Sequence, residues 1–284
     1  MKKNKMDLSI VLNSFLSLIV ASQGVSGSVA QAGQARSYAI TEWNGDCSGS
    51  ERSWWDDMCM AWRHKMGDKG WSQWWNNYEL VKVSKFTDPS INAWGVDNGA
   101  NGIDRGDATL LCTHGGYNAE GWYGLMHTSD HGECGANVGQ MKLGTASGGK
   151  IRFWQMSSCN SIRWEHREKW FAPAEGKVHV ITGFHGFMYI GWPYVGEYED
   201  LAEDGFTSKG VGRAWVDNMH HVDHWYNIYK TICPIALGFG DTAAKSTKAL
   251  KERYSSNWSD SDPNYMTTRW KSGCDPDDAD ALPN

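Results

Sequence analysis

The chain carries ATLLCTHGG at residues 108–116, a short apolar run that ends on a histidine and two glycines. A second run, IRFWQMSSC at residues 151–159, ends on a cysteine in the same way. Each run has the length and composition of a buried strand. Neighbouring parallel strands end at the crevice where open α/β sheets place their ligands, so we expect His114 and Cys159 to face each other across a cleft.

A cysteine and a histidine at one sheet edge are candidates for nucleophilic catalysis. The imidazole can take the thiol proton or hold the thiolate as an ion pair, and the sulfur can then attack a carbonyl carbon. In an active pair we expect the pKa of Cys159 to lie below the ordinary thiol value of about 8.5. The alternative for Cys159 is a small buried apolar residue. His185, which also ends an apolar run, is a rival partner to His114.

Strand and helix signals alternate along the rest of the chain. We expect strands at 37–43, 80–86, 108–113, 151–157, 177–184 and 232–238, and helices at 53–65, 71–78, 162–171, 210–229 and 242–254. This order predicts one α/β domain over residues 37–255, with a mostly parallel central sheet and helices on both faces.

The two ends of the chain differ from this domain. Residues 1–30 combine a basic start, a short apolar run over 10–21 and a small-residue cleavage site at 28–30, which is typical of a secretory signal peptide. A retained membrane anchor is the alternative, but the apolar run is short for a bilayer. We therefore expect a secreted protein with no membrane association after signal removal. Residues 256–284 form a polar tail, acidic and disordered from Ser272.

Charge and cysteine content narrow the function classes. The net charge is −6 and no basic block is present, so we expect no nucleic-acid partner. Seven cysteines in an exported chain leave at least one thiol unpaired. We expect Cys159 to stay free and Cys47 to pair with Cys59, because both lie in one polar, tryptophan-rich segment. The pairing of the other cysteines is open.

A family resemblance rests on motifs in a fixed order. These are GIDRGD at 102–107, the strand that ends in His114-Gly115, the strand that ends in Ser157-Ser158-Cys159, Gly183-Phe184, and the block from Ala214 to Ala244. In this order they resemble the caspase-like cysteine peptidases, a superfamily that includes caspases, gingipains, legumain and clostripain. Within that superfamily the chain is most similar to the DUF6345 family, over roughly residues 37–255.

The resemblance implies a caspase-like three-layer sandwich and a peptidase that acts on a peptide or protein substrate. It implies that Cys159 is the nucleophile, that His114 is the general base, and that Gly115 is a backbone donor to the oxyanion, which is worth about 3 kcal/mol of barrier. Cys159 is followed by Asn160-Ser161 where caspases have Arg-Gly. No residue matches those that set cleavage specificity in the characterised peptidases. We expect no cofactor and no metal.

Other side-chain clusters suggest alternatives. His127, His131 and Cys134 could bind zinc, but the neighbouring glycines favour a surface loop over a helix. The histidines at 220, 221 and 224 are expected on a polar helix face. Seventeen tryptophans are expected to pack mainly in the core, although Trp54-Trp55 and Trp74-Trp75 could line a sugar-binding groove. A non-catalytic, tryptophan-rich binding module on the same fold is therefore the alternative function.

Overall fold

The structure is a computed structural model that describes residues 32–284 except 44, 78–79, 145–147, 176–177, 227, 257–258 and 261. The expected signal peptide lies outside the described residues. The elements, in chain order, are β1 (Gln34–Ala39), α1 (Trp54–Asp68), β2 (Ser72–Asn77), η2 (Val83–Phe86), η3 (Ile103–Arg105), β3 (Ala108–Cys112), β4 (Gly115–Asn118), β5 (Gly121–Asp130), β6 (Glu133–Asn137), η4 (Val138–Gln140), β7 (Phe153–Ser157), η5 (Trp164–Phe171), β8 (Val180–His185), α2 (Trp192–Gly205), α3 (Val211–Asn218), β9 (Cys233–Gly240), α4 (Ala243–Ala249) and β10 (Tyr265–Arg269). No described helix is long and apolar enough to cross a membrane.

A seven-stranded sheet in the order β10-β9-β8-β7-β3-β1-β2 forms the centre of the described chain. The five strands from β8 to β2 are parallel, whereas β9 is antiparallel to β8 and β10 is antiparallel to β9. Every residue of β3 and β7 is buried, as expected of strands that are covered on both faces. The prediction of an α/β fold with a mostly parallel sheet is confirmed.

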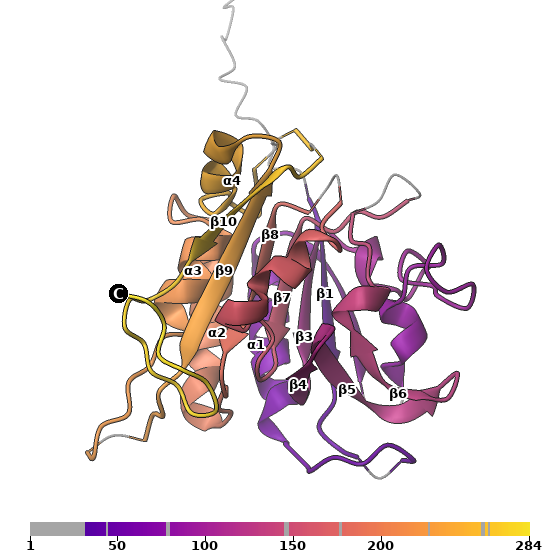
Figure 1. Ribbon diagram of the computed structural model, residues 1–284, viewed down its shortest axis with the longest axis horizontal. Coiled ribbons are helices and arrows are strands. Elements are labelled where there is room, and N and C mark those ends of the chain that lie inside the picture. The colour runs from indigo at the N-terminus through magenta and orange to yellow at the C-terminus, as the bar shows by residue number, and fades with distance from the viewer. Residues whose placement is uncertain are drawn as a thin grey trace, which may run out of the picture. The chain divides into compact units, whose positions relative to one another are not determined.

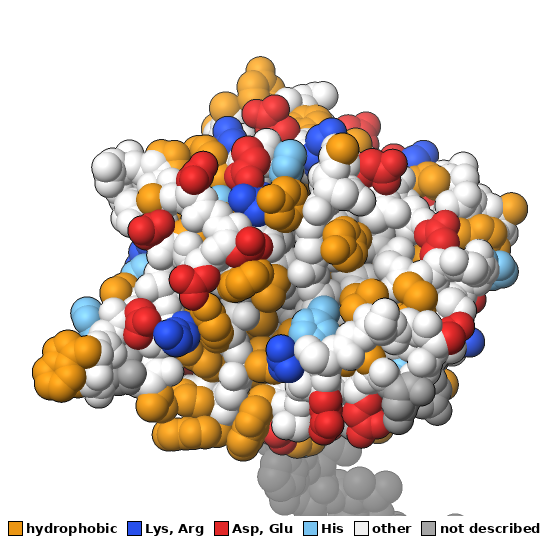
Figure 2. Space-filling view, turned by 60° about the horizontal axis from the view of Figure 1, so that its bottom comes forward, with side chains coloured by type: hydrophobic (Ala, Val, Ile, Leu, Met, Phe, Trp, Pro, Cys, Tyr) orange, Lys and Arg blue, Asp and Glu red, His pale blue; other side chains and the backbone are white. Residues whose placement is uncertain are grey.

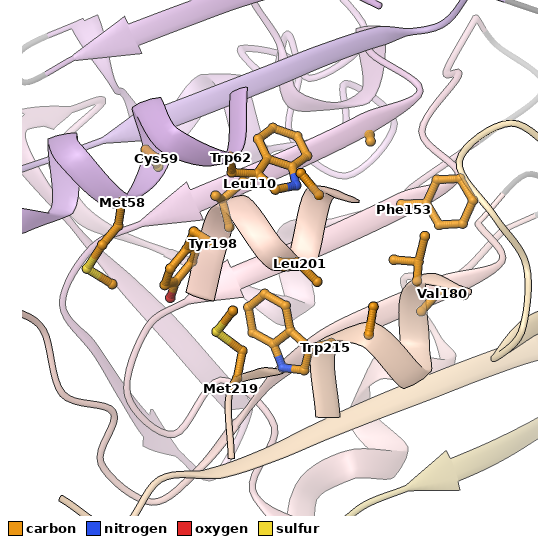
Figure 3. Packing of buried hydrophobic residues seen from close by; sticks show 14 of the residues in the cluster. Met58, Cys59, Trp62, Leu110, Phe153, Val180, Tyr198, Leu201, Trp215 and Met219 are labelled. Carbon is orange, nitrogen blue, oxygen red and sulfur yellow. The ribbon is translucent and has the colours of Figure 1, made fainter. Parts of the chain in front are cut away.

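All four described α-helices pack on one face of this sheet. The side chains that they bury belong to one core cluster, which also contains the small residues Ala35, Ala108 and Ala236 of the strands. Figure 3 shows this cluster, with Trp62, Tyr198 and Trp215 filling the space between the helices and the sheet. The prediction of helices on both faces is therefore wrong for the α-helices.

The opposite face is covered by short 3-10 helices and by a small antiparallel sheet of β4, β5 and β6 (Figure 1). Trp154 and Met156 of β7 point into the core on this side, together with Trp122 of β5 and Trp170 of η5. The segment 162–171, expected as a helix, folds as 3-10 helix η5, and the indole of Trp170 donates to the Ser161 carbonyl at 2.8 Å. Three layers therefore exist, but only one of them is built from α-helices.

Three predicted elements are wrong. In the segment expected as a helix over 71–78, Ser72–Asn77 form strand β2 instead, because Trp74 packs on Tyr38 while the backbone pairs with β1. Residues 80–86 hold 3-10 helix η2 instead of a strand. The helix expected over 210–229 ends at Asn218, and α2 was not predicted, although Pro193 in its first turn is a helix-start signal.

The cysteines pair differently from the expectation. Cys47 bonds to Cys134, Cys59 to Cys112 and Cys233 to Cys274, and Cys159 is free as predicted. The predicted Cys47–Cys59 bridge is wrong, because Cys59 on α1 faces the adjacent strand β3 while the loop with Cys47 lies against β6. Three disulfides are typical of proteins that fold in an oxidising compartment.

The C-terminal region is ordered, so the prediction of a disordered tail is wrong. Strand β10 adds an antiparallel edge to the sheet at residues 265–269, beyond the expected domain end at residue 255. Beyond β10, the disulfide between Cys274 and Cys233 ties the chain to the start of β9, and Leu282 is buried. The α/β domain therefore includes this region.

Asp97, in the loop before β3, predicts a pH-dependent stability. Burial and the charges of Asp104 and Asp88 raise the pKa of Asp97 to about 8. Between about pH 4 and pH 8 the folded state holds a proton that the unfolded state has lost, so the free energy of unfolding falls as pH rises through this window. Urea unfolding of Asp97→Asn should show a flatter pH dependence than wild type. Parallel pH profiles would contradict the assignment.

Candidate functional site

The ends of β3 and β7 bring His114 and Cys159 to one cavity. The parallel register aligns Cys112 with Ser157, and each functional side chain lies two residues further on. The cavity encloses about 800 Å³ at the edge of the sheet where the parallel strands end. Its lining consists of Glu51, Arg52, Ser53, Trp54, Trp55, His114, Gly115, Cys159, Phe187, Met188, Tyr189 and Ile190. The expectation that the two residues share a cleft is confirmed.

The cavity walls differ in character. One wall is the start of α1 with the polar residues before it, and the other is the loop between β8 and α2, which contributes four consecutive apolar or aromatic side chains at 187–190. Figure 2 turns the lower side of Figure 1 forward and shows hydrophobic side chains gathered on this face around a hollow. The site can therefore accept an organic substrate with apolar groups.

His114 is held by two indoles and by Ser50, whose carbonyl and hydroxyl both contact Nε2, the hydroxyl at 3.2 Å. Its Nε2 lies 2.7 Å from the Ser50 carbonyl oxygen, and its ring centroid lies 4.5 Å from Trp43 and 4.9 Å from Trp55. A carbonyl oxygen only accepts, so in the neutral ring the proton is on Nε2 and the lone pair is on Nδ1. Burial lowers the pKa of His114, and the charge of Arg52 acts in the same direction. The ring is therefore a neutral base at pH 7.

Cys159 is a neutral thiol in this arrangement. Its Sγ donates to the carbonyl of Met188 at 3.6 Å, and among the described residues no hydrogen bond joins it to His114. Burial raises the pKa of the thiol, and the charge of Asp278 adds to the rise. The expectation of a depressed thiol pKa is wrong for this state.

Gly115 has a backbone N–H that is not used in pairing with β5, and it stands where the structure leaves no room for a side chain. Gly115 lies opposite Gly124 of β5. The neighbouring pair, His114 and Leu125, is hydrogen-bonded, with Leu125 N–H donating to the His114 carbonyl at 2.9 Å. Because hydrogen-bonded and non-hydrogen-bonded pairs alternate in an antiparallel sheet, the Gly115 N–H points away from β5. A Cβ at this position would lie 2.1 Å from Ser158 Oγ and 2.5 Å from the Cys159 carbonyl oxygen. The backbone of β4 at Gly115 therefore approaches the loop after β7, which carries Cys159, as closely as glycine allows.

The backbone turns sharply after Cys159. Asn160 has a φ of 54°, in the left-handed region that asparagine tolerates better than most residues. Its N–H donates to the Gly186 carbonyl at 2.8 Å, which joins the loop after β7 to the loop after β8. These two loops, which carry Cys159 and one cavity wall, are therefore coupled.

The rival partner His185 is a structural residue. The Trp164 N–H donates to its Nδ1 at 3.1 Å, and its Nε2 donates to the Asp280 carbonyl at 2.7 Å. Both ring nitrogens are thus occupied, and the side chain is buried. His185 holds the C-terminal region against β8 and does not line the cavity.

The other clusters do not assemble into sites. Cys134 is in a disulfide and cannot be a thiolate ligand, while His131 stacks on Trp94. Among the described residues, no group of three or more His, Cys, Asp or Glu side chains has the geometry of a metal site. The histidines at 220–224 follow α3 instead of lying on it, and burial lowers the pKa of His221 to about 4.

The tryptophans mainly pack in the core, as expected. Those that are almost completely buried are Trp55, Trp62, Trp154, Trp170 and Trp215. Trp54 and Trp55 line the cavity beside the cysteine, so that pair belongs to the candidate site. Trp74 and Trp75 lie on edge strand β2, where each stacks with an arginine, and they form no groove with the first pair.

Three parts of the site were not predicted from the sequence. They are the Ser50 carbonyl, the indole of Trp43 and the loop at 187–190. The first acts through the main chain and leaves no residue signal, but the apolar cluster FMYI directly after His185-Gly186 was a readable sign of a cavity wall.

A scan against protein-family models and a search of curated proteins find no match for this chain.

Gly115→Ala tests the close approach of β4 to the loop that carries Cys159. The new methyl group must displace Ser158 or the Cys159 backbone, so we expect a loss of about 1–3 kcal/mol in the free energy of unfolding. The matched control is Gly196→Ala in α2, where a Cβ meets nothing within 4 Å and alanine favours the helix. Equal stability of the two variants in urea would refute the packing argument.

The alkylation of Cys159 by iodoacetamide tests its protonation state. Because the other six cysteines are in disulfides, wild type reports on this thiol alone. The alkylation rate should rise with pH, because only the thiolate reacts. The midpoint of this rise should lie above about 8.5, because burial raises the pKa of the Cys159 thiol. Urea-unfolded protein should give the ordinary midpoint. A rate that stays high and constant below pH 7 would instead indicate a preformed thiolate–imidazolium pair.

Proposed function

We propose that this protein is a secreted cysteine hydrolase of the caspase-like type that cleaves peptide bonds. One observation carries the proposal: a free thiol, a neutral imidazole with its Nδ1 lone pair available, and a backbone N–H directed away from its sheet line a single cavity. These groups are a nucleophile, a base and an oxyanion donor, which acyl transfer requires.

The mechanism follows from the protonation states. As Cys159 Sγ attacks the substrate carbonyl carbon, its proton moves to Nδ1 of His114, and the carbonyl oxygen becomes an oxyanion stabilised by the Gly115 N–H. The imidazolium then gives this proton to the leaving amine, and an acyl-enzyme remains. Water attacks the acyl carbon with His114 as base, which releases the acid and restores the thiol. The Ser50 carbonyl accepts from Nε2–H at each step, so Nδ1 is the nitrogen that takes up and releases the moving proton.

The order of elements supports the likeness to the caspase-like superfamily and to DUF6345. The histidine and the cysteine follow adjacent parallel strands, the histidine comes first along the chain, and a glycine follows it. Three disulfides and the signal-like start of the sequence support secretion. The apolar wall at 187–190 favours a peptide or protein substrate with apolar side chains.

Hydrolysis of a fluorogenic peptide library tests the proposal. Cys159→Ala removes the nucleophile and only a small side chain, so it should stay folded by circular dichroism and lose at least about 10³-fold in kcat/KM. His114→Ala should lose about 10²-fold to 10³-fold, because residual thiolate can still react.

The paired result separates catalysis from binding. If wild type cleaves no peptide or ester in the library, the tryptophan-rich binding module becomes the better description. Cleavage that survives Cys159→Ala would place the activity elsewhere.

A further inference from the structure

The C-terminal segment, defined as residues 274–280, lies against both loops that carry the candidate site. On the cavity wall, the Phe187 N–H donates to the Asp277 carbonyl at 2.9 Å and the Tyr189 hydroxyl donates to the Asp277 carboxylate. Figure 1 shows the C-terminal end of the chain, in yellow, beside β9 and away from the small sheet. The segment therefore supports the wall formed by residues 187–190.

The same segment holds the loop that follows the nucleophile. Asp278 Oδ2 accepts a hydrogen bond from Asn160 Nδ2 at 3.0 Å, and its carbonyl accepts one from Arg163 Nη1 at 3.0 Å. Asp278 makes both contacts from a left-handed backbone conformation, with a φ of 68°. Asn160, the residue that it binds, also has a left-handed backbone and directly follows Cys159.

Fixed points on both sides keep the segment in place. The Cys233–Cys274 disulfide attaches one end to the start of β9, and the Asp280 carbonyl accepts a hydrogen bond from His185 at the end of β8. Asp278 lies between these two attachments. A surface tail without them would pay a large entropic cost to hold one side chain in a single geometry.

We infer that Asp278 is a positioning residue for Cys159: its carboxylate holds Asn160 in the left-handed turn that directs the thiol toward the Met188 carbonyl at the cavity wall. The consequence for catalysis rests on the proposed function, whereas the consequence for thiol reactivity does not. The negative charge of Asp278 also disfavours the thiolate, so the carboxylate has two separable effects on one sulfur.

Two substitutions separate these effects. Asp278→Asn removes the charge but keeps an oxygen that can accept from Asn160, and Asp278→Ala removes both. In low salt, both variants should lower the pH midpoint of Cys159 alkylation and raise the alkylation rate at pH 8 by about twofold or more. High salt screens the charge of Asp278, so the difference between Asp278→Asn and wild type should shrink there. Asp275→Asn, an exposed carboxylate on the same segment, is the matched control and should behave as wild type.

Kinetics then test the positioning. Asp278→Ala should lower kcat on a peptide substrate by at least about tenfold with little change in KM, and Asp278→Asn should restore most of kcat. If wild type cleaves no substrate, the proposed function fails while the alkylation midpoints still test Asp278. Wild-type midpoints in both variants would overturn the inference, as would an Asn variant with kcat as low as the Ala variant. If Asp278→Ala unfolds, the Asn variant still decides the charge effect.

Discussion

The parallel pairing of β3 with β7 is the constraint on which the candidate site depends. It places His114 and Cys159 at the same level of neighbouring strands, before any loop contributes. The pairing cannot slip by one residue, because Leu110 is buried among the helices while Leu111 is buried against the small sheet on the other side. A shift in register would exchange those two environments and separate the functional residues.

The fold was predictable where the sequence buries both faces of a strand. The apolar runs that became β3, β7, β8 and β9 were found because continuous apolar residues leave few alternatives. Segment 71–78 was misassigned because its tryptophans fit a helix face as well as an edge strand, and only the neighbouring strand decides between them. The Cys47–Cys134 bridge, 87 residues apart in sequence, follows from tertiary placement that no local pattern contains.

The site was predictable to a similar extent and for a related reason. Side chains at the ends of apolar runs, such as His114 and Cys159, are visible in the sequence, and so is the glycine after the histidine. Burial sets their protonation states, and their hydrogen-bond partners are the carbonyls of Ser50 and Met188, a group that every residue type possesses. Their role depends on loop paths, and loop paths depend on contacts between segments far apart in the chain.

The main-chain nature of the contact to His114 has an evolutionary consequence. Replacing the side chain at position 50 removes the hydroxyl that lies 3.2 Å from Nε2 of His114, but the shorter contact to the Ser50 carbonyl remains and keeps the proton on Nε2. Insertions or deletions between Cys47 and α1 would move that carbonyl, and the Nε2 proton of His114 would lose its acceptor. Divergent relatives of this chain should therefore keep the length of this stretch constant and tolerate a new side chain at position 50 better than a shift of its backbone.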